Sequence, residues 1–119
     1  MSFKIIVVEP ARTWIHELRK CDRDTLTQIA AALDVLQTEG PALGRPLVDR
    51  ITGSTLPNLK ELRPGSKGDS EVRMLFVFNP ERNAVILVGG NKAGNWSGWY
   101  RTAIKEAEAA YQAYTEEEA

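Results

Sequence analysis

Two β-rich runs in the second half of the chain constrain the fold most strongly. The runs, 71–78 and 84–88, are rich in Val, Ile, Leu, Phe and Met, and the segment 79–83 between them (NPERN) has the composition of a turn. A third strand is expected over 59–63, and it precedes them across a turn-forming segment, 64–69. Because consecutive strands are usually neighbours in a sheet, the sequence predicts three adjacent antiparallel strands.

The first half of the chain predicts one strand and two helices. Residues 3–8 form a short β-branched run, and Pro10 suits the first turn of a helix because its missing N–H is not needed there. Asp22 or Asp24 would cap a second helix, which Gly40-Pro41 ends. The apolar side chains at helical spacing are Trp14, Ile15, Leu18 and Cys21, then Leu26, Ile29, Leu33 and Leu36. The helical pair is expected to cover one face of the sheet.

The remaining segments predict two irregular stretches and a last helix. Residues 41–57 show no sustained periodicity, so they are expected to form a long irregular connection. A glycine-rich loop is expected from Gly89-Gly90-Asn91 onward, and a helix from about Trp99. Residues 115–119 should fray because glutamates are unfavourable at a helix C-terminus. The 119 residues are therefore expected to form a single α+β domain, 1–119.

Composition excludes several classes of protein. A single cysteine, Cys21, cannot form an internal disulfide, and one cysteine with one histidine, His16, cannot build a tetrahedral zinc site. Cys21 is expected to be a small buried hydrophobe, and His16 to lie on the helix surface or at its boundary with the core. No apolar run is long enough to span a membrane, and the N-terminus does not resemble a secretion signal. We expect a cytoplasmic protein with no metal, no cofactor and no membrane partner.

Charge is distributed unevenly along the chain. Residues 1–59 carry seven basic and seven acidic side chains, whereas residues 60–105 carry eight basic and four acidic ones. The five glutamates of residues 106–119 make the net charge negative. A basic segment of this kind suits a polyanionic partner such as nucleic acid, although solvated surface lysines would give the same count.

The basic segment also contains the candidate functional residues. Arg73 lies in a strand whose far half is apolar on both faces, so it needs a partner, either a substrate phosphate or a carboxylate such as Glu61 or Glu71. Both alternatives are open from the sequence. Trp96 and Trp99 are either core residues or platforms on which RNA bases stack.

RNA cleavage needs only residue types that this segment offers. The ribose 2′-hydroxyl is an internal nucleophile, so fixed cations that stabilise charge at phosphorus supply much of the catalysis. Lys60 is the candidate base, because a desolvated lysine near arginines has a lowered pKa, and Tyr100 is the candidate acid. Arg63, Arg73 and Lys92 are the candidate charge stabilisers. This hypothesis requires Arg73 and Lys92 to share one positively charged hollow.

Four segments carry a resemblance to a known family. They are 44–49 (GRPLVD), 59–63 (LKELR), 72–76 (VRMLF) and 89–96 (GGNKAGNW). With the order of strand, helical hairpin and three strands, they resemble the phage-derived HigB-like branch of the RelE/ParE toxin superfamily. The resemblance implies a RelE-like fold, in which an N-terminal strand and helical hairpin pack on a small, mainly antiparallel sheet with a C-terminal helix.

The resemblance also implies an activity. RelE-like and HigB-like toxins of type II toxin–antitoxin systems cleave mRNA in the ribosomal A site without a metal ion. The family's strand arginine falls on Arg73, and the basic residues of its preceding strand fall on Lys60 and Arg63. Its basic residue after the last strand falls on Lys92.

The family's C-terminal tyrosine falls on Tyr100 or on Trp99. The implied partners are the ribosome, mRNA and an antitoxin with a helix-turn-helix domain, which would bind DNA itself. Two alternatives belong to other functional classes. One is a ParE-like toxin that inhibits DNA gyrase by protein contacts, and the other is an inactive remnant that binds only antitoxin; fold alone does not choose among them.

Overall fold

The computed structural model describes residues 2–65 and 71–118. Within these residues the chain forms one five-stranded sheet in the order β1-β5-β4-β3-β2, in which β1 and β5 are parallel and the other pairs antiparallel. The elements are β1 (Ile5–Val7), α1 (Ala11–Cys21), α2 (Arg23–Glu39), a short 3₁₀ turn η1 (Gly40–Ala42), β2 (Val48–Arg50), β3 (Lys60–Leu62), β4 (Val72–Phe78), β5 (Ala84–Asn91) and α3 (Trp96–Glu118). The α+β prediction and the antiparallel order β3-β4-β5 are confirmed, and the arrangement is compatible with a RelE-like fold.

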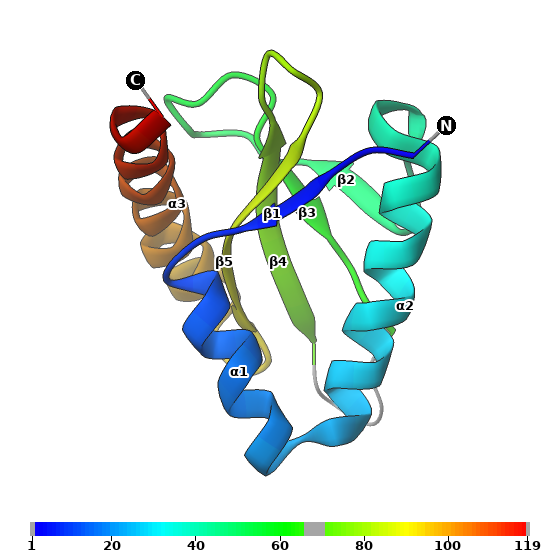
Figure 1. The fold of residues 1–119 in the computed structure, drawn as a ribbon. Coiled ribbons are helices and arrows are strands. Elements are labelled where there is room, and N and C mark those ends of the chain that lie inside the picture. Colours follow the sequence, from blue (N-terminus) through cyan, green and yellow to red (C-terminus); the bar gives the residue numbers. More distant parts are fainter. Residues whose placement is uncertain (1, 66–70, 119) are drawn as a thin grey trace.

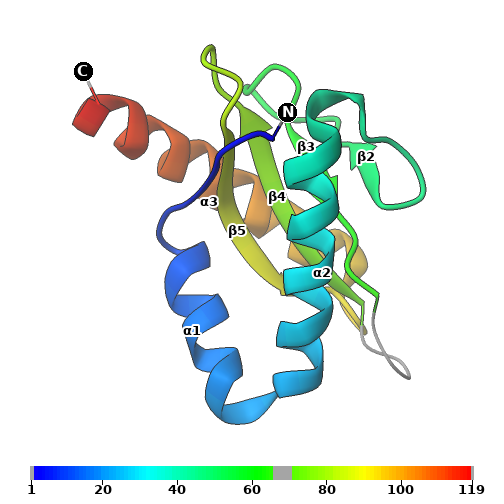
Figure 2. The ribbon, with the colours of Figure 1, turned by 45° about the vertical axis from the view of Figure 1, so that its right-hand side comes forward.

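The sheet is covered by helices on both faces. Figure 1 shows α1 and α2 on one face and α3 on the other, and the turned view in Figure 2 shows the same layers. The helical hairpin packs Leu18, Ile29 and Leu36 against one apolar cluster of the sheet. The second cluster, under α3, contains Ala103 and Ala107, whose small side chains let that helix approach the strands closely.

The alternation of β4 explains how one strand serves both clusters. Val72, Met74 and Phe76 belong to the cluster under α1 and α2, whereas Leu75 and Val77 belong to the cluster under α3. Successive side chains of a strand point to opposite faces, so a run that is apolar at every position must be buried on both sides. Full burial of a side chain such as that of Phe76 contributes about 1.5–3 kcal/mol.

Local signals at the ends of α2 act as the sequence predicts. The carboxylate of Asp22 accepts a hydrogen bond from the Thr25 N–H at 3.1 Å, so Asp22 is the N-cap of this helix. At the other end Gly40 has a φ of 62°, and a Cβ there would overlap the ring of Phe3. Glycine therefore fits this position both by its conformation and by its lack of a side chain.

Two segments predicted as irregular are strands instead. β2 lies inside the expected connection 41–57, and its three residues are too few to show an alternating pattern; the strand exists because it pairs with β3. β5 continues through Gly89-Gly90-Asn91, where a loop was expected. A Cβ on Gly89 would overlap Trp14 of α1, and a Cβ on Gly90 would come within 2.6 Å of Trp99 Nε1. The glycines admit an indole on each face of the strand.

Other differences are smaller. The Cys21 side chain is exposed rather than buried, because it lies in the last turn of α1, beyond the contact with the sheet, and its Sγ hydrogen-bonds the Glu17 carbonyl. Helix α3 begins at Trp96, earlier than expected, and remains helical to Glu118, so most of the segment expected to fray is ordered as helix.

The turn expected at 64–69 lies largely outside the described residues. His16 lies on α1, on the helix surface as expected. Among the described helices, none combines the length and the apolar character needed to cross a lipid bilayer.

Candidate functional site

A buried carboxylate, that of Glu61, lies at the centre of a set of polar side chains on the α3 face of the sheet. Glu61 is the middle residue of β3 and is only 4% exposed. Tyr100, in the first turns of α3, donates its hydroxyl proton to Glu61 Oε1 at 2.6 Å. Arg63 donates from Nη2 to Glu61 Oε2 at 2.9 Å. We call Glu61, Arg63, Arg73 and Tyr100 the Glu61 cluster.

Arg73 reaches this cluster from the adjacent strand. Its Nε lies 3.5 Å from Glu61 Oε1, and its Nη1 donates to the Val72 carbonyl at 2.9 Å. The buried Nε–H makes no hydrogen bond with any described residue. Of the two alternatives that the sequence left open, the structure therefore shows Arg73 beside a carboxylate, and that carboxylate is Glu61.

The surroundings of Tyr100 favour its neutral form. Burial, followed by the hydrogen bond to Glu61, raises the pKa of Tyr100 to about 12. The same carboxylate raises the pKa of Arg63 through their hydrogen bond. At neutral pH the site therefore holds a protonated phenol beside two guanidinium groups, which are a proton donor and stabilisers of negative charge.

Lys92 lies on the same face but has a different carboxylate. It follows β5 and is 1% exposed, and its Nζ donates to Glu71 Oε2 at 3.0 Å. The bond from Lys92 is the main reason that the pKa of Glu71 is lowered. The Nζ also lies 3.1 Å from the ring centroid of Trp96, a cation–π contact.

The two tryptophans of the predicted stacking pair have unlike environments. Trp96 is 60% exposed, so part of its ring surface is open to solvent. Trp99 is half-buried over Gly90 and meets Tyr100 edge to face, with 5.0 Å between ring centroids. Of the two residues on which the family's tyrosine could fall, Tyr100 is the one whose hydroxyl belongs to the Glu61 cluster.

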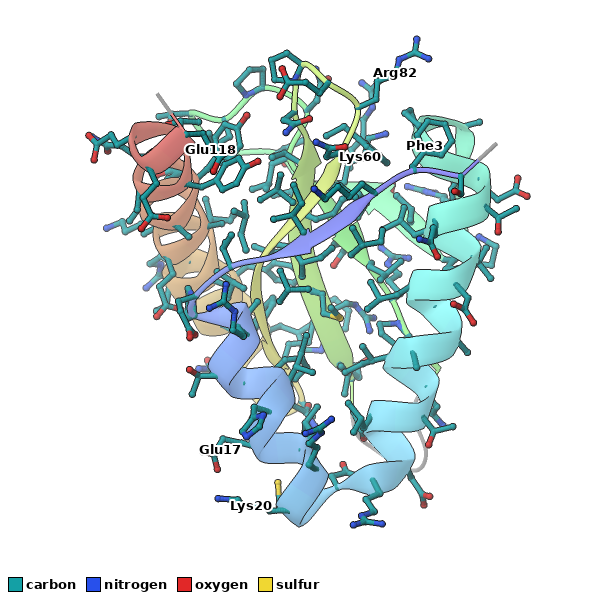
Figure 3. All side chains as sticks on the ribbon, viewed as in Figure 1. Phe3, Glu17, Lys20, Lys60, Arg82 and Glu118 are labelled. Atoms are coloured by element: carbon teal, nitrogen blue, oxygen red, sulfur yellow. The ribbon has the colours of Figure 1, made fainter. Side chains whose placement is uncertain are left out.

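The side chain of Lys60 does not reach the Glu61 cluster. It is paired with Phe76, a residue of the core under α1 and α2, while its neighbour Glu61 is paired with Leu75 of the core under α3. Alternation therefore directs Lys60 to the opposite face of the sheet. Figure 3 shows it toward the end of the sheet where Arg82 lies. Burial, with a smaller contribution from Arg50, lowers the pKa of Lys60.

The polar group on the α3 face is close to electrically balanced. Among the described residues, each of its cations has a carboxylate within 4.0 Å: Arg63 has Glu61 and Asp49, Arg73 has Glu61, and Lys92 has Glu71. Arg73 and Lys92 point to the same face, as the sequence hypothesis required, but they do not form a hollow with a large surplus of positive charge. The carboxylates are as much a part of the site as the cations.

Sequence reasoning considered Glu61 only as a structural partner and missed Asp49. The available signal was a carboxylate between the apolar residues Leu59 and Leu62 in a short strand, next to a strand that carries an arginine, Arg73, among apolar residues. Asp49 could not be found because β2 was not predicted.

The amino-acid sequence is similar to one protein family and to two named proteins. Residues 16–112 match the model of the family described as "Phage derived protein Gp49-like". Over 104 residues, 87% of this chain, it is 52% identical to "Putative toxin HigB2" of Mycobacterium tuberculosis, and this alignment spans only half the length of that relative. It is 42% identical to "Putative toxin HigB3" of the same organism, over 87% of this chain and 86% of that protein. No solved structure matches significantly.

Proposed function

The chain belongs to the Gp49-like family of phage-derived proteins, and from this membership we propose that it is a HigB-like toxin of a type II toxin–antitoxin pair. The proposal follows the names of two relatives that match most of the chain. Its partner would be an antitoxin, of the helix-turn-helix class that the family resemblance implies. The antitoxin would bind DNA, and the toxin would meet DNA only through it.

The activity we propose is metal-independent cleavage of mRNA on the ribosome. The observation that carries it is the hydrogen bond from Tyr100 to the buried Glu61, which places a phenol, kept protonated by burial and by this bond, on the same carboxylate that Arg63 and Arg73 approach. The 2′-hydroxyl would lose its proton to water as its oxygen attacks phosphorus, the bond from phosphorus to the 5′-oxygen would break, and Tyr100 would protonate that oxygen, leaving a 2′,3′-cyclic phosphate and a free 5′-hydroxyl. The arginines would stabilise the charge on the phosphorane oxygens.

The other candidate residues take supporting roles in this proposal. Trp96 would stack an RNA base on its exposed ring, and Lys92 would hold that ring in place from below. Trp99 would position Tyr100 through their edge contact. Lys60 is left out of the reacting set because it lies on the opposite face of the sheet.

A second candidate function has one specific observation in its favour. Arg63, Arg73 and Lys92, the candidate cations of the α3 face, are each already paired with a carboxylate. A phosphate would have to compete with these carboxylates, whereas a protein surface would not. A toxin that acts by protein contacts, in the manner of ParE on gyrase, would suit such a balanced surface.

The test is ribosome-dependent cleavage of a defined mRNA by the purified protein, read as new RNA 5′ ends. Tyr100→Phe keeps the ring and removes the proton, and we expect it to slow cleavage by about 10²–10⁴-fold, the usual contribution of a general acid. Tyr111→Phe, on the same helix and remote from Glu61, is the matched control and should cleave like the parent.

Two results would contradict the cleavage proposal. One is a Tyr100→Phe protein that cuts at the parent rate. The other is intact mRNA together with accumulating DNA breaks after induction in cells, which would select the gyrase alternative. A protein that causes neither effect and leaves growth unchanged would be the inactive remnant.

A further inference from the structure

A cavity at the free edge of the sheet is lined by basic residues that do not belong to the Glu61 cluster. It has a volume of ≈ 270 Å³ and lies where β2 and the loop before it meet β3. Three basic side chains line it, Arg45, Arg50 and Lys60, with one acidic residue, Asp49. Two of the three basic residues come from the strands themselves, so the cavity wall is fixed by the sheet.

Arg50 and Lys60 stand directly opposite each other in the β2–β3 ladder. Side chains of directly opposed residues lie on the same face and close together, and like charges in this arrangement are destabilising. Among the described residues, no carboxylate lies within 4.0 Å of either charged group, whereas every cation of the Glu61 cluster has one. The sheet therefore places the positive charges of Arg50 and Lys60 close to each other, with no described carboxylate to compensate them.

Asp49 does not neutralise this pair. Its carboxylate bonds to Arg45 at 3.2 Å and to Arg63 at 3.0 Å, and it accepts a hydrogen bond from the main-chain N–H of Arg50. The Asp49 carboxylate therefore joins a cation of the cavity wall to a cation of the Glu61 cluster. The cavity and the cluster lie on opposite faces of the sheet, but they are connected around its β2 edge.

We propose that this cavity is a phosphate subsite, in which Arg50 and Lys60 bind a backbone phosphate of an RNA strand whose neighbouring nucleotides reach the Glu61 cluster. An oxyanion between the two cations would remove their repulsion and gain charge-assisted hydrogen bonds from both. The position of Arg63 favours RNA, because Arg63 lies 3.0 Å from Asp49 of the cavity wall, so one strand crossing the β2 edge would meet the cavity and then Arg63. This inference rests on the proposed function, and it gives Lys60 a binding role in place of a catalytic one.

The experiment measures binding of a labelled single-stranded oligoribonucleotide to the full chain at several salt concentrations. The variant is Arg50→Gln combined with Lys60→Gln. The matched control is Arg19→Gln with Lys20→Gln, which removes the same charge from two adjacent exposed residues of α1. All three proteins carry Tyr100→Phe, so that binding is measured without cleavage.

We expect the cavity variant to bind the oligoribonucleotide about tenfold more weakly than the parent and the control. The dependence of log affinity on log salt should also become shallower by about 0.7 for each RNA phosphate that the variant no longer neutralises. Inorganic phosphate should weaken RNA binding by the parent more than by the cavity variant if the subsite also takes the free ion. Thermal denaturation should show the variant to be about as stable as the parent, because the repulsion that is removed offsets the lost contact of Lys60 Nζ with the Phe78 ring, 5.4 Å from its centroid.

Three outcomes would overturn the inference. Equal RNA affinity in the cavity variant and the control is one. A variant that is far less stable than the parent in thermal denaturation would show that Arg50 and Lys60 stabilise the fold instead of repelling each other. Unchanged RNA binding with weakened binding of a polyglutamate peptide would assign the cavity to protein carboxylates. Cleavage on the ribosome is measured separately, so a protein that binds RNA through this cavity but cuts nothing would refute the proposed activity alone.

Discussion

Lys60 and Glu61 are consecutive residues of β3, but they take part in two different electrostatic arrangements. On the α3 face, Glu61 binds Tyr100 and Arg63 and lies beside Arg73, so charge is balanced within the protein. On the other face, Lys60 shares its cavity with Arg50, and no described carboxylate neutralises the two. The count of basic residues in a segment therefore does not tell how much positive charge is available to a ligand. The positive charge available to a ligand depends on the direction in which each basic side chain points and on whether a carboxylate pairs with it.

Removal of the Glu61 carboxylate should lower the stability of the protein more than any other change in the Glu61 cluster. Glu61→Ala would leave two guanidinium groups and a phenol without their shared partner, and loss of one member of a buried ion pair costs about 3–5 kcal/mol. Urea denaturation should show a fall of this size in the free energy of unfolding. Glu106→Ala, an exposed glutamate of α3, should change it by no more than about 0.5 kcal/mol. Equal losses in the two variants would mean that the cluster does not stabilise the fold.

Adding one methyl group should distinguish the two regions by their packing. Gly90→Ala would place a Cβ 2.6 Å from Trp99 Nε1 and push the indole toward Tyr100, and overpacking of this kind costs about 1–3 kcal/mol. Gly44→Ala, in the wall of the cavity, has no atom within 4 Å of the new Cβ and should be close to neutral. Thermal denaturation of both variants checks the difference. A neutral Gly90→Ala would show that Trp99 moves freely.

Alkaline pH should weaken the Glu61 cluster through Tyr100. Because the pKa of Tyr100 is raised to about 12 in the folded protein, from 10.0, the folded state holds this proton more tightly. The stabilisation is fully present below pH 10 and is lost as the pH rises from 10 to 12. With a discount for solvent screening, we expect a loss on the order of 1 kcal/mol. Unfolding measured across this range should show a shallower decline for Tyr100→Phe, and parallel curves would contradict the assignment.

Reversal of one charge in the cavity should have the smallest effect and the opposite sign. Arg50→Glu turns a like-charge cross-strand pair into an ion pair with Lys60, so the free energy of unfolding should rise by about 0.5 kcal/mol. Arg50→Gln, which removes the repulsion without adding attraction, should lie between the two. Chemical denaturation at low salt resolves the order, and a fall in stability from Arg to Gln to Glu would refute the repulsion.

The sequence predicted the elements that have strong periodicity and the candidates that have distinctive chemistry. The apolar run of β4, the helical hairpin and a cap at Asp22 or Asp24 follow from local patterns, and all three are present, with Asp22 as the cap. β2 did not follow, because three residues carry no period and its existence depends on pairing with β3. The glycines of β5 resemble a loop until the two indoles that need the space are known.

The candidate site shows the same division between local and non-local information. The sequence predicted Arg63, Arg73, Lys92 and Tyr100 as candidates, and the structure places their side chains on the α3 face. It could not assign a face to Lys60, because a shift of one residue in register reverses the direction of a side chain. Nor could it identify Glu61 as the shared partner, since the residues that meet there are up to 39 positions apart.

The adjacent glycines of β5 have a consequence for communication between the two sides of the molecule. Trp14 of α1 rests on Gly89 and Trp99 rests on Gly90, so at this point only the thickness of a peptide backbone separates the helical hairpin from the residue beside Tyr100. A protein that binds α1 and moves Trp14 would displace Gly89 and, through the adjacent Gly90, Trp99. Because Trp99 contacts Tyr100, binding on the α1 face would change the orientation of the Tyr100 phenol without any contact with the Glu61 cluster.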